Sequence, residues 1–136
     1  MNRVFADAFY YFALLNPADE MHSAAREFTV GFAGTMVTTA WVLTEVGDGL
    51  ARFPNRPVFL RLMAELRANA DVHIFPPDAG LFERGLDLYT NRPDKEWSLT
   101  DCVSFVVMRE EQITDALTGD HHFGQAGFNV LLNSSR

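Results

Sequence analysis

Short apolar runs alternate along the chain with longer stretches in which apolar residues recur every three or four positions. The short runs predict buried strands over residues 3–6, 36–38, 72–75, 115–118 and 128–132. The longer stretches predict helices over residues 9–15, 18–32, 39–49, 58–69, 78–89 and 98–109. Strands that alternate with amphipathic helices are typical of an α/β domain. We therefore expect a three-layer α/β/α sandwich with a mainly parallel five-stranded sheet.

Polar residues mark where several of these elements begin. Asn16 and Pro17 are a typical cap and first residue of a helix, so the second helix is expected to begin near Ala18. Residues 119–123 contain Gly119 and follow a predicted strand, which predicts a turn.

The most apolar helix begins at Ser98, where a charged approach changes abruptly into an apolar run. Ser98 is a favourable N-cap, and Asp101, three residues later, is where the acid of a capping box lies. Asp101 can therefore stabilise the free N–H groups of the first turn. The same position on a rigid helix also suits a metal ligand, and at this point both interpretations stay open.

Four acids are expected to gather at one end of the sheet. Asp7 and Asp120 directly follow predicted strands, while Glu45 and Asp101 lie near the beginnings of helices. In open parallel sheets, ligands bind beyond the carboxyl ends of the strands. The element order therefore predicts that these four side chains converge there.

A cluster of carboxylates is costly, because like charges a few ångströms apart repel and raise one another's pKa values. A divalent cation removes this conflict. Mg²⁺ or Mn²⁺ takes hard oxygen ligands and keeps several waters, and it is often held by a few carboxylates together with substrate phosphate. Phosphodiester hydrolysis is the chemistry that fits such a site.

Composition limits the class of protein. The chain has 136 residues, of which 48% are hydrophobic, so it is expected to form one soluble domain with a sizeable core. It has neither a membrane-length apolar run nor a signal-peptide pattern, and we expect it in the cytoplasm. The single Cys102 lies within an apolar helix and is interpreted as a core residue.

The formal charge of −7 argues against a protein that holds nucleic acid by bulk electrostatics. It does not exclude a nuclease, because an acidic metal site carries part of that charge by design. Four arginines within residues 52–67 are interpreted either as a phosphate-facing arm or as a solvated helical face: Arg52, Arg56, Arg61 and Arg67.

Four segments, in order, resemble the successive motifs of the PIN domain, and together they span almost the whole chain. They are Phe5–Phe9, Val37–Glu45, Asp94–Cys102 and residues 116–128. The resemblance implies a single PIN-like domain over residues 1–136 and a site in which four acids coordinate Mg²⁺ or Mn²⁺ and activate water for RNA cleavage. Carried over to this sequence, those acids are Asp7, Glu45, Asp101 and Asp120.

The resemblance also points to residues around the acids. A hydroxyl beside the third acid often supports such sites, which indicates Thr100 or Ser98. Lys95 and Arg92 precede the central helix and are candidates to contact a phosphate, or else are solvated loop charges. The chain departs from the family pattern at Ala8, where a small hydroxyl residue is usual.

Two histidines follow the fourth acid. Because His121 and His122 are adjacent, they are expected to point in different directions and not to form a paired zinc site. They are interpreted as turn residues.

Many small PIN domains resemble VapC-type toxins, which are ribonucleases held inactive by a cognate antitoxin and are commonly dimeric. The leading hypothesis is thus a metal-dependent endoribonuclease with RNA as substrate, an antitoxin as partner and a homodimeric assembly. The alternative is a PIN-like module that binds RNA or protein without cutting. A phosphoacceptor receiver domain is disfavoured, because Asp7 is not part of an acidic pair, and a haloacid-dehalogenase-type phosphatase would need an acid where Phe9 stands.

Overall fold

The computed structural model describes residues 2–133 of the chain. A five-stranded sheet lies at its centre, and its strands have the order β3-β2-β1-β4-β5, all parallel. The strands are β1 (Arg3–Ala6), β2 (Thr35–Thr39), β3 (Val72–Phe75), β4 (Asp115–Leu117) and β5 (Asn129–Val130). The predicted α/β class and parallel sheet are confirmed.

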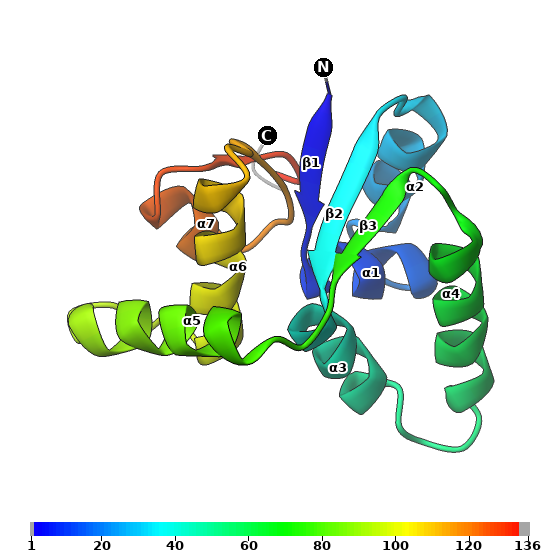
Figure 1. Ribbon diagram of the computed structural model, residues 1–136. Coiled ribbons are helices and arrows are strands. Elements are labelled where there is room, and N and C mark those ends of the chain that lie inside the picture. The colour runs from blue at the N-terminus through cyan, green and yellow to red at the C-terminus, as the bar shows by residue number, and fades with distance from the viewer. Residues whose placement is uncertain (1, 134–136) are drawn as a thin grey trace.

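Within residues 2–133, seven helices pack around the sheet. They are α1 (Ala8–Leu15), α2 (His22–Gly31), α3 (Ala40–Gly49), α4 (Arg56–Ala68), α5 (Ala79–Asn91), α6 (Leu99–Glu110) and α7 (His121–Gln125). Figure 1 shows α5, α6 and α7 on one side of the sheet and α1, α2 and α4 on the other, while α3 lies below the ends of the strands. This arrangement is the predicted three-layer sandwich.

The strand order places a topological switch point at the centre of the sheet. From β1 the chain moves outward through β2 to β3, and it then crosses back through α5 and α6 to place β4 on the other side of β1. The carboxyl ends of β1 and β4 therefore lie side by side with connections leading away in opposite directions. Such a point is where α/β folds bind ligands.

The core is built on β1 and α6. Phe5, Phe105 and Phe123 are fully buried, and the ring of Phe105 lies edge-on to that of Phe123 with centroids 4.9 Å apart. Cys102 is also fully buried, which confirms it as a core residue. Helix α5 packs closely on α6 at Gly85, where an added Cβ would come within 2.5 Å of a methyl group of Val103.

The largest differences from the sequence prediction concern α2, α7 and β5. Helix α2 begins at His22 instead of Ala18, because the side chains of Asn16 and Asp19 accept hydrogen bonds from the N–H groups of Ala18 and Met21 and so stabilise successive turns. The predicted turn at residues 119–123 was wrong, since the short helix α7 begins at His121. Strand β5 has only two residues, Asn129 and Val130.

None of the helices in residues 2–133 is both long and apolar enough to cross a bilayer.

Candidate metal centre

The first acid lies at the end of the central strand. Asp7 directly follows β1 and is only 4% exposed. Its N–H donates to the carbonyl of Leu117 at 3.3 Å, and its Oδ2 accepts a hydrogen bond from the Thr118 hydroxyl at 2.9 Å. Asp7 is thus joined to the end of β4 by both its backbone and its side chain.

The third acid caps the central helix as predicted. The Asp101 N–H donates to Ser98 Oγ at 3.0 Å, and Asp101 Oδ2 accepts from the Ser98 N–H at 3.2 Å. Both bonds of the capping box are therefore present. The residue is 8% exposed, so a carboxylate that caps a helix is also nearly enclosed.

The remaining two acids approach from α3 and from the end of β4. Glu45 lies on α3, and its side chain is largely exposed. Asp120 is half-buried and held by two bonds: its N–H donates to Thr118 Oγ1 at 3.1 Å, and its Oδ1 accepts from the His122 N–H at 2.9 Å.

The electrostatics show that the four carboxylates lie close enough to repel one another. Burial raises the pKa of Asp7 to about 7; the Thr118 hydrogen bond opposes this shift, and the charges of Asp101 and Glu45 add to it. The pKa of Asp101 is raised by burial and then by the charge of Asp120. Charge repulsion thus links the acids that the sequence predicted to converge, and their role as metal ligands stays a prediction.

Glu45 is exposed, but its carboxylate interacts electrostatically with the other acids. Its pKa is raised first by loss of surrounding water and then by the charges of Asp101, Asp120 and Asp48. Asp48 was not singled out from the sequence. Its spacing of three residues from Glu45 along α3 was the available signal, because residues three apart lie on one helix face.

The hydroxyl that supports the site is that of Thr118, which sequence reasoning missed. It donates to Asp7 and accepts from the Asp120 N–H, and so it links the first and fourth acids. The bond from Thr118 gives Asp7 the hydroxyl partner that a hydroxyl residue at position 8 would otherwise be expected to supply, since Ala8 has no hydroxyl. The Thr118-Gly119-Asp120 sequence at the end of a strand was the signal for it, but only the pairing of β1 with β4 brings Thr118 to Asp7.

The predicted supporting residues have other contacts. Ser98 serves as the cap, and the carbonyl of Thr100 accepts a hydrogen bond from the Ser104 hydroxyl. Arg92 forms a two-point ion pair with Asp94, and its guanidinium lies 5.1 Å from the centre of the Trp97 ring.

Lys95 and Arg92 line a shallow recess together with Ser98 and Trp97. None of the four acids belongs to its walls in the described part of the chain. A phosphate contact by Lys95 or Arg92 stays a prediction.

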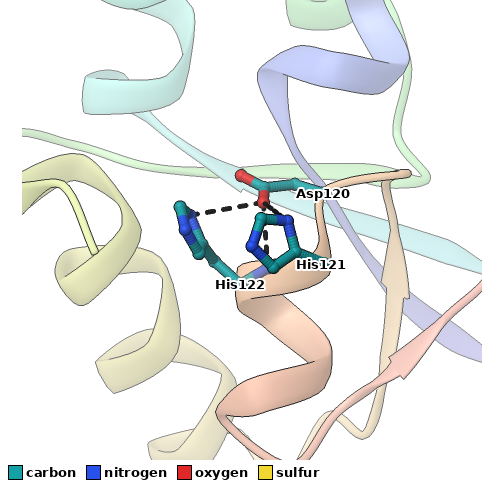
Figure 2. A group of neighbouring side chains, drawn as sticks. All are labelled: Asp120, His121 and His122. Atoms are coloured by element: carbon teal, nitrogen blue, oxygen red, sulfur yellow. Dashed lines mark hydrogen bonds and ion pairs between the residues drawn. The ribbon is translucent and has the colours of Figure 1, made fainter. Parts of the chain in front are cut away.

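The adjacent histidines do not point apart. The ring centroids of His121 and His122 are 4.3 Å apart, and Figure 2 shows both rings turned toward the Asp120 carboxylate. The expectation of divergent side chains was wrong, because His121 Nδ1 and His122 Nδ1 lie 3.8 and 3.3 Å from the same Asp120 oxygen. His122 Nδ1 also lies 3.5 Å from Asp101 Oδ2, which places this ring beside the acid cluster.

The donor set is suited to a hard divalent cation. Mutual repulsion and burial disfavour the ionised acids, and a cation between them would reverse both effects. Their carboxylate oxygens are the ligands that Mg²⁺ and Mn²⁺ prefer. The residues present thus fit a metal centre at the carboxyl edge of the sheet.

Comparison with known proteins agrees with this fold. No protein-family model matches the chain. It is 28% identical over 125 residues to the 23S rRNA-specific endonuclease VapC20 of Mycobacterium tuberculosis. The alignment covers 92% of this chain and 95% of the relative. The crystal structure of VapC20, described as a Sarcin-Ricin loop cleaving toxin, superposes with a TM-score of 0.83 over the same shares. The chain thus resembles VapC20 in both sequence and fold.

FitAcB from Neisseria gonorrhoeae is a more distant structural neighbour of this chain. It is 19% identical and superposes with a TM-score of 0.63 over 93% of this chain and 95% of the neighbour. At this identity the similarity concerns the fold alone.

The structure has another recess, a groove of about 780 Å³ between α3 and α4. Its walls are mainly apolar and include Leu43, Phe59 and Met63, with Arg56 and Arg67 at its edge. The four clustered arginines, Arg52, Arg56, Arg61 and Arg67, are all exposed, and two of them belong to this groove.

Proposed function

We propose that this VapC-like PIN domain is a divalent-metal-dependent endoribonuclease and the toxin of a toxin–antitoxin pair. The observation that carries the proposal is the convergence of Asp7, Glu45, Asp101 and Asp120 at the switch point of the sheet. The relative VapC20 supports it, because its name describes a 23S rRNA-specific endonuclease and its crystal structure a toxin. A ribosomal RNA hairpin is therefore the first substrate to test.

In this proposal Asp7, Glu45 and Asp101 hold the ion, and Asp120 orients water or a second ion. The metal, Mg²⁺ or Mn²⁺, supplies a water of lowered pKa and a counter-charge for the phosphodiester. The protein supplies rigid placement. Thr118 sets the orientation of Asp7, and the capping bonds with Ser98 set that of Asp101, so neither carboxylate is free to turn away from the site.

Asp101 is both a helix cap and a proposed metal ligand, so an experiment must separate these two roles. Asp101→Asn removes the negative charge, and Ser98→Ala removes the cap but keeps the carboxylate. Both changes affect the same capping box, but Ser98→Ala keeps the Asp101 carboxylate and the hydrogen bond that it accepts from the Ser98 N–H, which makes Ser98→Ala the matched control. We expect Asp101→Asn to lower Mn²⁺-dependent cleavage about a hundredfold or more. Ser98→Ala should retain cleavage and lose about 1 kcal/mol of folding stability.

The measurement is cleavage of a labelled RNA hairpin in Mn²⁺ and in EDTA, with thermal unfolding recorded in parallel. If Asp101→Asn cuts as fast as the wild type, Asp101 is a cap and not a ligand. If the folded wild-type protein neither cuts RNA nor binds Mn²⁺, the non-catalytic RNA- or protein-binding module becomes the better account.

We further propose that the chain works as one domain in the cytoplasm, where its RNA substrate lies, and that it forms a homodimer held inactive by an antitoxin protein. The support is the description of VapC20 as a toxin. Induced expression of the wild type in bacteria should arrest growth, and Asp101→Asn should not. Growth that is equally slow with both proteins would argue against a toxic nuclease. Sedimentation of the purified chain as a monomer would argue against the dimer.

A further inference from the structure

Two imidazole rings and one carboxylate meet at the N-terminal turn of α7. His122 Nδ1 lies 3.3 Å from Asp120 Oδ1, and His121 Nδ1 lies 3.8 Å from the same oxygen. Figure 2 shows the two rings side by side and facing that carboxylate. One potential ligand atom from each of the three residues lies within 4.8 Å of the others.

These separations are close to those within a metal coordination shell. With bonds of about 2.0–2.2 Å, neighbouring ligand atoms are about 3.0 Å apart in an octahedron and about 3.4 Å apart in a tetrahedron. The two histidine–carboxylate distances of 3.3 and 3.8 Å therefore need only small side-chain rotations to close around one ion.

Two hydrogen bonds hold Asp120 between these rings, one to its N–H and one to its carboxylate. The Thr118 hydroxyl accepts the Asp120 N–H at 3.1 Å, and Asp120 Oδ1 accepts the His122 N–H at 2.9 Å. Asp120 is thus held in place before any ion arrives. The side chain of His121 is 77% exposed, so this ring is free to rotate onto a ligand from solution.

We propose that Asp120, His121 and His122 form a second cation position, which binds a transition-metal ion such as Mn²⁺, Co²⁺ or Zn²⁺ in preference to Mg²⁺. Imidazole nitrogen suits these ions, whereas Mg²⁺ takes oxygen ligands and gives up its waters reluctantly. The position adjoins the carboxylate cluster, because His122 Nδ1 lies 3.5 Å from Asp101 Oδ2. It shares Asp120 with the proposed nuclease site and adds two imidazole ligands to it, and its cation binding is measured apart from RNA cleavage.

The test is a titration of the untagged chain with Co²⁺, whose visible absorption reports nitrogen ligands, in the presence of excess Mg²⁺. The Asp7→Asn variant isolates the second position, because it disables the carboxylate centre. We expect Asp7→Asn to bind one Co²⁺ that Mg²⁺ does not displace. Adding His121→Ala should weaken this binding at least about tenfold, and adding both His121→Ala and His122→Ala should abolish it.

His73→Ala is the matched control, since His73 is an exposed histidine on β3. Asp7→Asn carrying His73→Ala should bind Co²⁺ as tightly as Asp7→Asn alone. The proposal is overturned if Asp7→Asn binds no Co²⁺, if Mg²⁺ displaces the Co²⁺, or if the double histidine variant binds it unchanged. His121 is exposed enough that its replacement should leave the fold intact, which thermal unfolding checks. RNA cleavage is measured separately. Absence of cleavage would therefore contradict the nuclease proposal, and absence of Co²⁺ binding would contradict the second cation position.

Discussion

The buried carboxylate of Asp7 should make the metal-free protein less stable as the pH rises. Its pKa is raised by burial from 3.8 to about 7. Below about pH 4 the group is protonated in both the folded and the unfolded chain, so the penalty is absent. Between about pH 4 and 7 the unfolded chain loses the proton while the folded chain keeps it, and stability therefore falls with rising pH. Above about pH 7 the full penalty remains.

The size of this penalty follows from the pKa shift. The difference between 3.8 and about 7 is roughly 3 units, which at 1.36 kcal/mol per unit corresponds to about 4 kcal/mol. Asp7→Asn removes the charge and keeps an oxygen for the Thr118 hydroxyl, but it buries an amide N–H₂ that needs a partner. The amide costs about 2 kcal/mol at any pH. We therefore expect Asp7→Asn to stabilise the metal-free protein by about 2 kcal/mol at pH 8, where the charge penalty of about 4 kcal/mol is removed, and to destabilise it by about 2 kcal/mol at pH 4, where that penalty is absent.

The assay is urea denaturation of both proteins in EDTA from pH 4 to pH 8. Asp87→Asn, at an exposed position on α5, is the control and should show no such pH-dependent difference. Mn²⁺ should stabilise the wild type at pH 8 and stabilise Asp7→Asn far less, because the cation offsets the penalty that the variant lacks. If Asp7→Asn is less stable than the wild type at pH 8, or if the difference between them does not change with pH, the reasoning about this carboxylate is wrong.

Two further changes test the packing around the site. Thr118→Val should lower the free energy of unfolding, measured by urea denaturation, by about 1–3 kcal/mol, because it removes a hydroxyl that accepts the Asp120 N–H. It should also raise the pKa of Asp7 further, because that hydroxyl lowers it. An unchanged free energy of unfolding would mean that the hydroxyl is dispensable. Gly85→Ala should lower the free energy of unfolding by about 1–3 kcal/mol, since the added Cβ would lie 2.5 Å from a methyl carbon of Val103 and 3.2 Å from its Cα. A variant more stable than the wild type would show that α5 can move away from α6.

Local patterns in the sequence determined most of the elements and one contact of the site. The strands at Arg3–Ala6 and Val72–Phe75 agree with the prediction, because a short apolar run between polar residues has few alternatives. The capping box between Ser98 and Asp101 was also predictable, since both partners belong to one helical turn. The beginning of α2 was not predicted, because side-chain hydrogen bonds from Asn16 and Asp19 compete with helix formation.

The tertiary structure decided how the acids of the site are supported. Thr118 reaches Asp7 across 111 positions of sequence, and it does so only because β4 pairs with β1. The exposure of Glu45 and the approach of the two histidines to Asp120 likewise depend on how α3 and α7 lie against the sheet. Residue type and spacing thus determined which side chains gather at the carboxyl edge. Strand pairing and helix packing determined their hydrogen bonds, their burial and hence their pKa values.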